Sequence, residues 1–318
     1  MAETRTARPA ATFDCLWCGR RWTTRSPEDL EGWARLCPDC LGRAGDNPFL
    51  RFRLRDALAA RGASRGPANG AGEPPVPEPP VPHPGADESD PARSAVDAEM
   101  LAYYEARAAE YDDWYLRRGR YERGPIHDAA WNAELDRAGA WLDGLPIRGE
   151  IVELAAGTGW WSPLLAGKGE LWLYDAAEAP LERARDRLLA HRLRAHIHVR
   201  DAWAEPDRRV DAVVTNFWLS HVPRDRTAAF LGLVHRWLKP GGVFAFIDSL
   251  PDPQSGAADH PAPVEDHAVR RLADGREFRI VKVFRGSDEL ESALVGAGFQ
   301  DVQIATTGRF FVLGSARA

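Results

Sequence analysis

A run of small and acidic residues from Glu153 to Gly159 has the residue types and the spacing to bind a nucleotide-like cofactor. The apolar residues before Glu153 predict a strand, and the glycines after it allow a tight turn into a helix. Because Gly157 and Gly159 carry no Cβ, backbone N–H groups can approach a ligand closely there. Asp175 ends the next apolar run, where a carboxylate can accept hydrogen bonds from both hydroxyls of a ribose. By itself, this pattern fits NAD, FAD and S-adenosylmethionine equally well.

A second chemical pattern lies near the N-terminus, where all four cysteines of the chain occur. Cys15 and Cys18 form one Cys-x-x-Cys pair, Cys37 and Cys40 form the other, and 18 residues separate the pairs. Two such pairs complete a tetrahedral site with no open position, which is typical of structural Zn²⁺. We therefore predict a zinc ribbon over residues 10–61, with a redox pair or two local disulfides as alternatives. Its role is open between a scaffold, contact with a protein partner and contact with RNA.

Composition limits the remaining possibilities. The chain has 318 residues, enough for two domains, and a net charge of −6, which gives no general attraction to nucleic acid. We find no apolar run long enough to span a membrane and no signal peptide, so we expect a cytoplasmic protein without membrane contacts. Residues 62–93 are rich in Gly, Ala and Pro and predict a flexible linker to a domain over residues 94–318.

The elements that must position these residues follow from hydrophobic periodicity. Ser94 and Asp97 predict a helix start of the capping-box type. A second helix is expected from about Ile126 to Leu142. The expected aromatic face of the first helix consists of Leu101, Tyr104, Ala108, Tyr111 and Tyr115.

From Ile151 onward, apolar strands alternate with helices, which predicts a parallel sheet. The expected strand ends are Glu153, Asp175, Val199, Thr215 and Asp248. Helices are expected near 162–166, 178–191, 224–238 and 288–297. Strands at 302–306 and 310–314 form a hairpin, so the last strand is expected to run antiparallel to the others.

Four motifs together resemble those of the class I S-adenosylmethionine-dependent methyltransferases, in particular the small-molecule enzymes of types 11 and 25. They are the Glu153–Gly159 turn, Asp175 at the end of the second strand, Asp201 after the third strand, and Leu238–Gly242 before the fifth. The resemblance covers about residue 101 to the C-terminus. It implies an α/β fold with a Rossmann-like sheet of seven strands, an antiparallel last strand, and S-adenosylmethionine as cofactor.

The resemblance also implies roles for individual residues. Gly157 and Gly159 would lie against the methionine part of the cofactor, Asp175 would bind the ribose, and Asp201 would accept a hydrogen bond from the adenine amino group. The full set of expected cofactor contacts is Tyr104, Tyr111, Glu153, Ala155, Gly157, Gly159, Asp175, Ala176, Asp201, Ala202, Trp203, Asn216 and Phe217.

Methyl transfer needs a nucleophile held in line with the methyl group and shielded from water. A base is needed only if the nucleophile starts protonated. His221 follows the fourth strand, which borders the methyl site in this family, so it is the candidate base; a purely structural role is the alternative. His127, Asp266 and His267 are weaker candidates.

The acceptor is expected to be a small molecule with an O, N or C nucleophile. After the fourth strand, Asn216-Phe-Trp-Leu lacks the prolines that accompany methylation of amino groups in nucleic acids. An rRNA or tRNA methyltransferase that grips RNA through the ribbon is the first alternative, and a regulatory protein that binds the cofactor without turnover is the second.

The substrate-selective element is expected in the insertion over residues 250–273. Arginines in and after this insertion form either a solvated face or a site for a substrate carboxylate or phosphate; they are Arg270, Arg271, Arg276 and Arg279. Three tryptophans form either an apolar wall for the substrate or part of the core; they are Trp160, Trp161 and Trp218.

Overall fold

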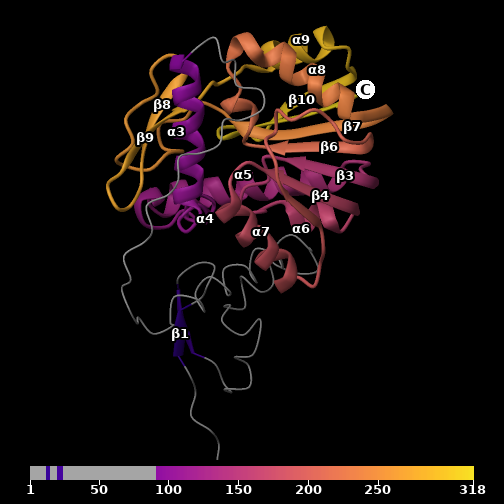
Figure 1. Cartoon of the computed structure of the whole chain (residues 1–318). Coiled ribbons are helices and arrows are strands. Elements are labelled where there is room, and N and C mark those ends of the chain that lie inside the picture. The colour runs from indigo at the N-terminus through magenta and orange to yellow at the C-terminus, as the bar shows by residue number, and fades with distance from the viewer. Residues whose placement is uncertain (1–11, 15–19, 24–90) are drawn as a thin grey trace, which may run out of the picture. The chain divides into compact units, whose positions relative to one another are not determined.

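The computed structural model describes residues 12–14, 20–23 and 91–318 (Figure 1). The chain divides into two compact units, Met1–Pro77 and Glu78–Ala318. In the first unit, β1 (Thr12–Asp14) pairs antiparallel with β2 (Arg21–Thr23). All four cysteines and residues 62–90 of the expected linker lie outside the described residues, so the zinc ribbon stays a prediction. Residues 91–93, at the end of the expected linker, already belong to a helix.

The second unit is built on a seven-stranded sheet with the order β10-β11-β7-β6-β3-β4-β5. Neighbouring strands are parallel except at β11, which runs antiparallel to both β7 and β10. This confirms the predicted fold. The strands are β3 (Gly149–Leu154), β4 (Gly169–Asp175), β5 (His196–Val199), β6 (Val210–Asn216), β7 (Leu238–Ser249), β10 (Gln300–Thr306) and β11 (Phe311–Arg317).

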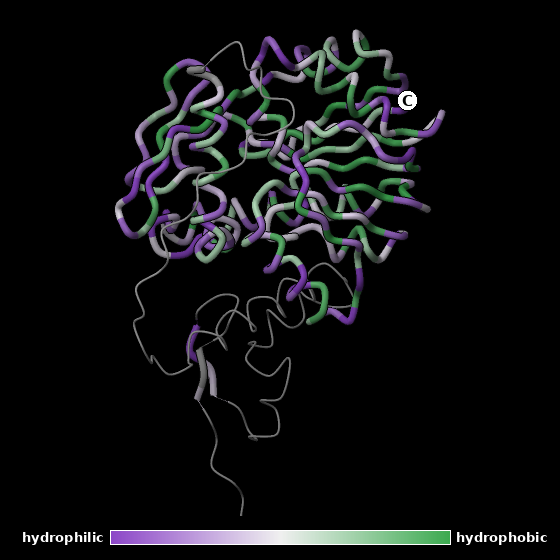
Figure 2. Tube along the Cα trace, in the orientation of Figure 1, coloured by the Kyte–Doolittle hydropathy of each residue, from purple (hydrophilic) through white to green (hydrophobic). Residues whose placement is uncertain are grey.

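The central strands are covered on both faces, as their nearly continuous apolar sequences require. Figure 1 shows α8 and α9 beside the β7 and β10 half of the sheet and α6 and α7 beside the β4 half, and Figure 2 shows the strands as mostly hydrophobic. In β7, Phe244 and Phe246 are fully buried. These helices are α6 (Ser162–Ala166), α7 (Glu178–Ala190), α8 (Thr227–Trp237) and α9 (Ser287–Gly296).

The segment before the sheet forms three helices: α3 (Pro91–Arg107), α4 (Asp112–Leu116) and α5 (Pro125–Gly144), with a 3-10 turn, η2 (Gly119–Tyr121), before α5. The predicted cap at Ser94 is wrong because the helix already begins at Pro91, a residue well suited to a first helical turn. The predicted continuous aromatic face is also interrupted, since α3 ends at Arg107. Tyr104 and Tyr111 therefore come from separate segments.

The end of the expected insertion forms the first strand of a β-hairpin that the sequence did not reveal, and the second strand follows the insertion. β8 (His267–Arg271) pairs antiparallel with β9 (Glu277–Val281), and the hairpin packs on α3 through an apolar cluster that includes Met100, Tyr103 and Ile280. Two 3-10 turns, η3 (Leu219–His221) and η4 (Arg224–Arg226), lead from β6 into α8. Among the described residues, every helix is too short or too polar to cross a lipid bilayer.

Candidate active site

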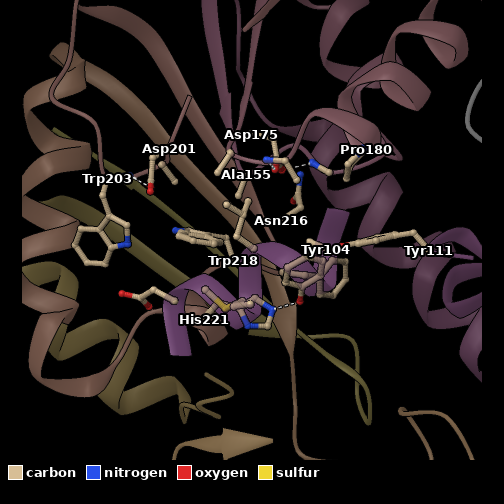
Figure 3. Close-up of a pocket in the computed structure, with 18 of the residues that line it drawn as sticks. Tyr104, Tyr111, Ala155, Asp175, Pro180, Asp201, Trp203, Asn216, Trp218 and His221 are labelled. Atoms are coloured by element: carbon tan, nitrogen blue, oxygen red, sulfur yellow. Dashed lines mark hydrogen bonds between the residues drawn. The ribbon is translucent and has the colours of Figure 1, made fainter. Parts of the chain in front are cut away.

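The turn after β3 is held in shape by a carboxylate from the next strand. Ala155, Gly157 and Gly159 all have positive φ angles, of 53°, 56° and 68°. The N–H of Gly157 donates to Asp175 Oδ2 at 2.8 Å, and the N–H of Ala177 donates to Asp175 Oδ1 at 2.9 Å (Figure 3). A carboxylate can accept about four hydrogen bonds, so Asp175 keeps capacity for a ligand. Burial raises the pKa of Asp175 to about 6.

A crevice opens beside this turn, at the carboxyl ends of β3, β4 and β6. It is lined by all the predicted cofactor contacts except Glu153 and Gly159. A Cβ on Gly159 would lie 2.7 Å from the Cβ of Ala184 on α7, so this glycine permits close packing of the helix against the turn. The predicted residues that line the crevice are Tyr104, Tyr111, Ala155, Gly157, Asp175, Ala176, Asp201, Ala202, Trp203, Asn216 and Phe217.

Glu153 supports the crevice from behind. Its side chain is buried, and it accepts hydrogen bonds from Ser162 Oγ at 2.6 Å and from Asn216 Nδ2 at 3.2 Å. Because the amide nitrogen of Asn216 is directed to Glu153, the amide oxygen must face the other way. That oxygen is buried and has no hydrogen-bond partner among the described residues. Burial raises the pKa of Glu153 to about 7.

The sequence reasoning missed several residues that line the crevice. Asp97 lies on α3 four residues before Leu101 and seven before Tyr104, which is the spacing of one helical face. That spacing could have placed Asp97 in the site. Pro180 and the other missed residues carried no such signal; the full set is Asp97, Met100, Ala177, Pro180 and Arg226.

A second cavity of about 500 Å³ adjoins the crevice. It is enclosed by residues of α3, α4 and η2, the 249–263 segment and the β8–β9 hairpin. The two spaces share Tyr104, Tyr111, Phe217 and His221 as lining residues. We call these four residues the rim. The rim therefore borders both spaces.

His221 is held at the rim in a defined tautomer. Its Nδ1 lies 2.6 Å from the carbonyl oxygen of Val281, and its Nε2 lies 2.7 Å from the hydroxyl of Tyr104 (Figure 3). A carbonyl oxygen only accepts, so Nδ1 carries the proton and Nε2 accepts the Tyr104 hydroxyl. Burial, together with the positive charge of Lys282, holds the pKa of His221 well below its usual range. The imidazole is therefore neutral, with its basic nitrogen directed to the rim.

Comparisons with known proteins identify the fold and the family. A family model described as a methyltransferase domain matches residues 151–242. A DhpI–SAH complex is 32% identical to the chain over 70% of it and 97% of DhpI, with a TM-score of 0.55. A DhpI–SAM–HEP complex is 33% identical over 70% of the chain and 98% of DhpI, with a TM-score of 0.57. No curated protein matches the chain. The chain belongs to the class I S-adenosylmethionine-dependent methyltransferases.

The crevice of this methyltransferase has the polar groups that S-adenosylmethionine requires. Asp175 and Asp201 present carboxylates to it, and Asn216 presents an unpartnered amide oxygen suited to the cofactor's ammonium group. The indole nitrogen of Trp218 is also buried and has no partner among the described residues, which leaves it free to donate. Phe217 is held at φ 60°, an unusual conformation for a bulky residue, where the strand ends at the rim.

The remaining predicted candidates lie elsewhere in the methyltransferase. His127 is buried beside Asp128, with 3.4 Å between Nδ1 and Oδ1, and lines neither space. Asp266 pairs with Arg224, and His267 is exposed at the start of β8. Trp160 and Trp161 are both 1% exposed and belong to the core, whereas Trp218 lines the crevice.

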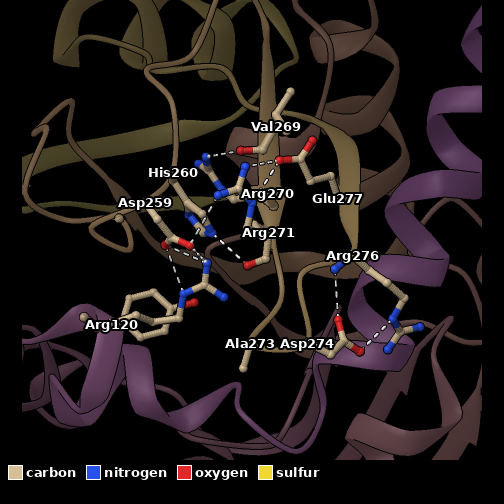
Figure 4. Close-up of polar contacts among 12 residues, drawn as sticks. Arg120, Asp259, His260, Val269, Arg270, Arg271, Ala273, Asp274, Arg276 and Glu277 are labelled. Carbon is tan, nitrogen blue, oxygen red and sulfur yellow. Dashed lines mark hydrogen bonds and ion pairs between the residues drawn. The ribbon is translucent and has the colours of Figure 1, made fainter.

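The four candidate arginines are separated by the structure. Three of them form ion pairs on the hairpin surface: Arg271 with Glu277, Arg276 with Asp274 and Arg279 with Glu99 (Figure 4 shows the first two). Only Arg270 lines the second cavity. Arg271, Arg276 and Arg279 therefore match the predicted solvated face. Arg270 matches the other prediction, a position that faces a substrate.

Proposed function

We propose that the protein transfers the methyl group of S-adenosylmethionine to a small molecule bound in the second cavity. The observation that carries the proposal is the rim, where the cofactor crevice and the second cavity share Tyr104, Tyr111, Phe217 and His221. A cavity of about 500 Å³ is within the range that holds a small organic molecule.

In the bound complex, Asp175 accepts hydrogen bonds from the ribose and Asp201 from the adenine amino group. Asn216 accepts a hydrogen bond from the cofactor's ammonium group. Glu153 acts indirectly, because it accepts a hydrogen bond from Asn216 and so fixes the orientation of that amide. The cofactor supplies a methyl group on a sulfonium, which is a good leaving group.

The aromatic residues of the rim hold the reacting groups together and exclude water. The acceptor atom forms a bond to the methyl carbon while the carbon–sulfur electron pair stays on sulfur. If the acceptor atom carries a proton, Nε2 of His221 takes it, either directly after displacing Tyr104 or through the Tyr104 hydroxyl. The tautomer set by Val281 keeps that nitrogen available.

The experiment supplies the full chain with S-adenosylmethionine labelled in the methyl group, and with either a small-molecule extract or total RNA. We expect label in a small molecule and none in acid-precipitable RNA. Label in RNA would overturn the small-molecule proposal in favour of RNA methylation. Cofactor binding without transfer to either pool would favour a regulatory role.

The zinc ribbon remains part of the proposed organisation. In the sequence, Cys15 and Cys18 lie between β1 and β2, which pair antiparallel, and this order along the chain is the one expected of a ribbon. We propose that Cys37 and Cys40 complete the site.

A further inference from the structure

The second cavity contains an unusual concentration of positive charge. Arg107 and Lys282 each have only 8% of their surface exposed, and Arg270 is partly buried beside them; all three line the cavity. Buried cations are normally paired with a carboxylate, because an unpaired buried charge is costly. None of the carboxylates that the structure describes forms an ion pair with any of these three side chains.

Arg107 is held by aromatic rings in place of a counter-charge. Its guanidinium carbon lies 4.3 Å from the ring centroid of Tyr111, 5.5 Å from that of Tyr103 and 5.9 Å from that of Tyr121. Ring faces attract a cation without neutralising it. Its Nε is buried and has no hydrogen-bond partner among the described atoms. The arrangement thus keeps a full positive charge on a residue that lines the cavity.

Lys282 and Arg270 are held by neutral groups as well. The ammonium of Lys282 donates to Ser220 Oγ at 2.8 Å and to Ser249 Oγ at 3.3 Å, and one Nη of Arg270 donates to the Val269 carbonyl at 3.3 Å. Burial lowers the pKa of Lys282 only to about 8, so it stays protonated at neutral pH.

The negative groups near the cavity are already engaged. Asp252 lines it but pairs with Arg309 at 2.6 Å. Asp248, the acid that most favours charged Lys282, accepts hydrogen bonds from the backbone N–H groups of Ser220 and Ser249. These N–H groups leave Asp248 its negative charge, but one carboxylate cannot balance Arg107, Arg270 and Lys282, so the cavity keeps an excess of positive charge.

We infer that the methyl acceptor is an oxyanion, a small molecule whose carboxylate or phosphoryl group binds among Arg107, Arg270 and Lys282. This inference rests on the proposed function, because it names the substrate class of the same site. The three cations supply several donors to one small group, and charge-assisted hydrogen bonds are the strong kind. The bound oxyanion would supply the negative charge that balances these three cations.

The first experiment measures anion binding without turnover. The full chain, saturated with S-adenosylhomocysteine, is titrated with inorganic phosphate and, separately, with acetate in low-chloride buffer, and heat or tryptophan fluorescence is recorded. We expect saturable binding of at least one anion, weakened about tenfold or more in Arg270→Gln and in Lys282→Gln, because each removes a charge-assisted contact. The matched control, Arg276→Gln, removes the same charge from the same hairpin but from the ion pair with Asp274, and should bind like the wild type.

S-adenosylhomocysteine affinity is measured in every variant as the check on folding. Neither Arg270 nor Lys282 lines the cofactor crevice, so that affinity should stay within about threefold of the wild type. Intact cofactor binding with no saturable anion binding, or with equal anion binding in all variants, would overturn the oxyanion inference and leave the proposed function standing. Absence of cofactor binding in the wild type would overturn the proposed function itself.

The second experiment decides the charge of the natural acceptor. A small-molecule extract is passed over an anion-exchange resin, and both the flow-through and the salt eluate are tested for methyl acceptance. We expect acceptance in the eluate, reduced in Arg270→Gln and unchanged in Arg276→Gln. Acceptance confined to the flow-through would identify a neutral or cationic acceptor and refute the inference.

Discussion

Replacing Asp175 with alanine tests the assignment of the cofactor crevice most directly. The carboxylate already accepts one backbone N–H on each oxygen, from Gly157 and Ala177, and the burial that raises its pKa to about 6 is present before any ligand binds. Its remaining lone pairs are available for two ribose hydroxyls. A hydrogen bond to a charged group contributes about 1.5 kcal/mol at the low end. Losing two should therefore weaken cofactor binding by about 3 kcal/mol, or roughly 150-fold in Kd.

Calorimetric titration with S-adenosylhomocysteine measures this loss. Asp175→Asn should also bind poorly, because its NH₂ group must face one of the two backbone N–H donors that now meet oxygens. The control is Asp274→Ala, which removes an exposed carboxylate from the β8–β9 turn. A Kd for Asp175→Ala within about threefold of the wild type would show that this carboxylate does not bind the ribose.

The same carboxylate predicts a pH dependence of cofactor binding. The ionised form is the better acceptor, and its pKa in the free protein is about 6, so protonation at pH 5 competes with binding. Between pH 7.5 and pH 5 the wild-type Kd should rise about tenfold, following the fraction of ionised Asp175. Asp175→Ala should lack this component. An equal pH dependence in both proteins would assign the titration to another group.

Three further predictions concern the support of the site and the first unit. Asn216→Ala removes the unpartnered amide oxygen and should raise the Kd for S-adenosylhomocysteine about tenfold, measured by calorimetry, whereas an unchanged Kd would remove it from the cofactor site. The pKa of Glu153 is about 7 in the folded protein, above the ordinary 4.5, so the folded state binds the proton more tightly than the unfolded state does. The stability that this proton contributes is lost as the pH rises from the ordinary value to about 7. Between pH 5 and pH 8, the stability of Glu153→Gln, measured by urea unfolding, should accordingly fall by about 2–3 kcal/mol less than that of the wild type, and equal losses in the two proteins would contradict the shift. Elemental analysis of the full chain should find about one zinc per chain, and Cys37→Ser should lower it; a metal-free wild type would refute the ribbon.

The sequence predicted most of the residues that line the crevice because their determinants are local. A tight turn between β3 and the following helix needs particular residues at adjacent positions, Asp175 is the last residue of β4, and Asp201 comes two residues after the end of β5. In a parallel sheet the carboxyl ends of neighbouring strands meet at one edge. Locating the strands therefore also located the residues beside the crevice.

The second cavity could not be predicted in the same way, because it depends on contacts across long sequence separations. Arg107 ends α3 and Lys282 follows β9, and they approach one another only because the hairpin packs on α3. Four arginines looked equivalent in the sequence, and only the ion partners supplied by the fold separate Arg270 from Arg271 and Arg276. The helix break after Arg107, which brings Tyr104 and Tyr111 to the rim from separate segments, was hidden by a continuous helical spacing.

The two halves of the site differ in charge, and this difference bears on the reaction. The crevice presents Asp175 and Asp201, which suits a cofactor of net positive charge, whereas the second cavity presents Arg270 and Lys282. If the acceptor is an oxyanion, each reactant binds beside charges opposite to its own. If that oxyanion is itself the nucleophile, it brings no proton, so transfer would need no base. His221, whose pKa is held down by burial and by the positive charge of Lys282, would then orient Tyr104 and close the rim. In that case His221→Gln should change the KM of the acceptor more than kcat, whereas a large fall in kcat with an unchanged KM would assign His221 to proton transfer.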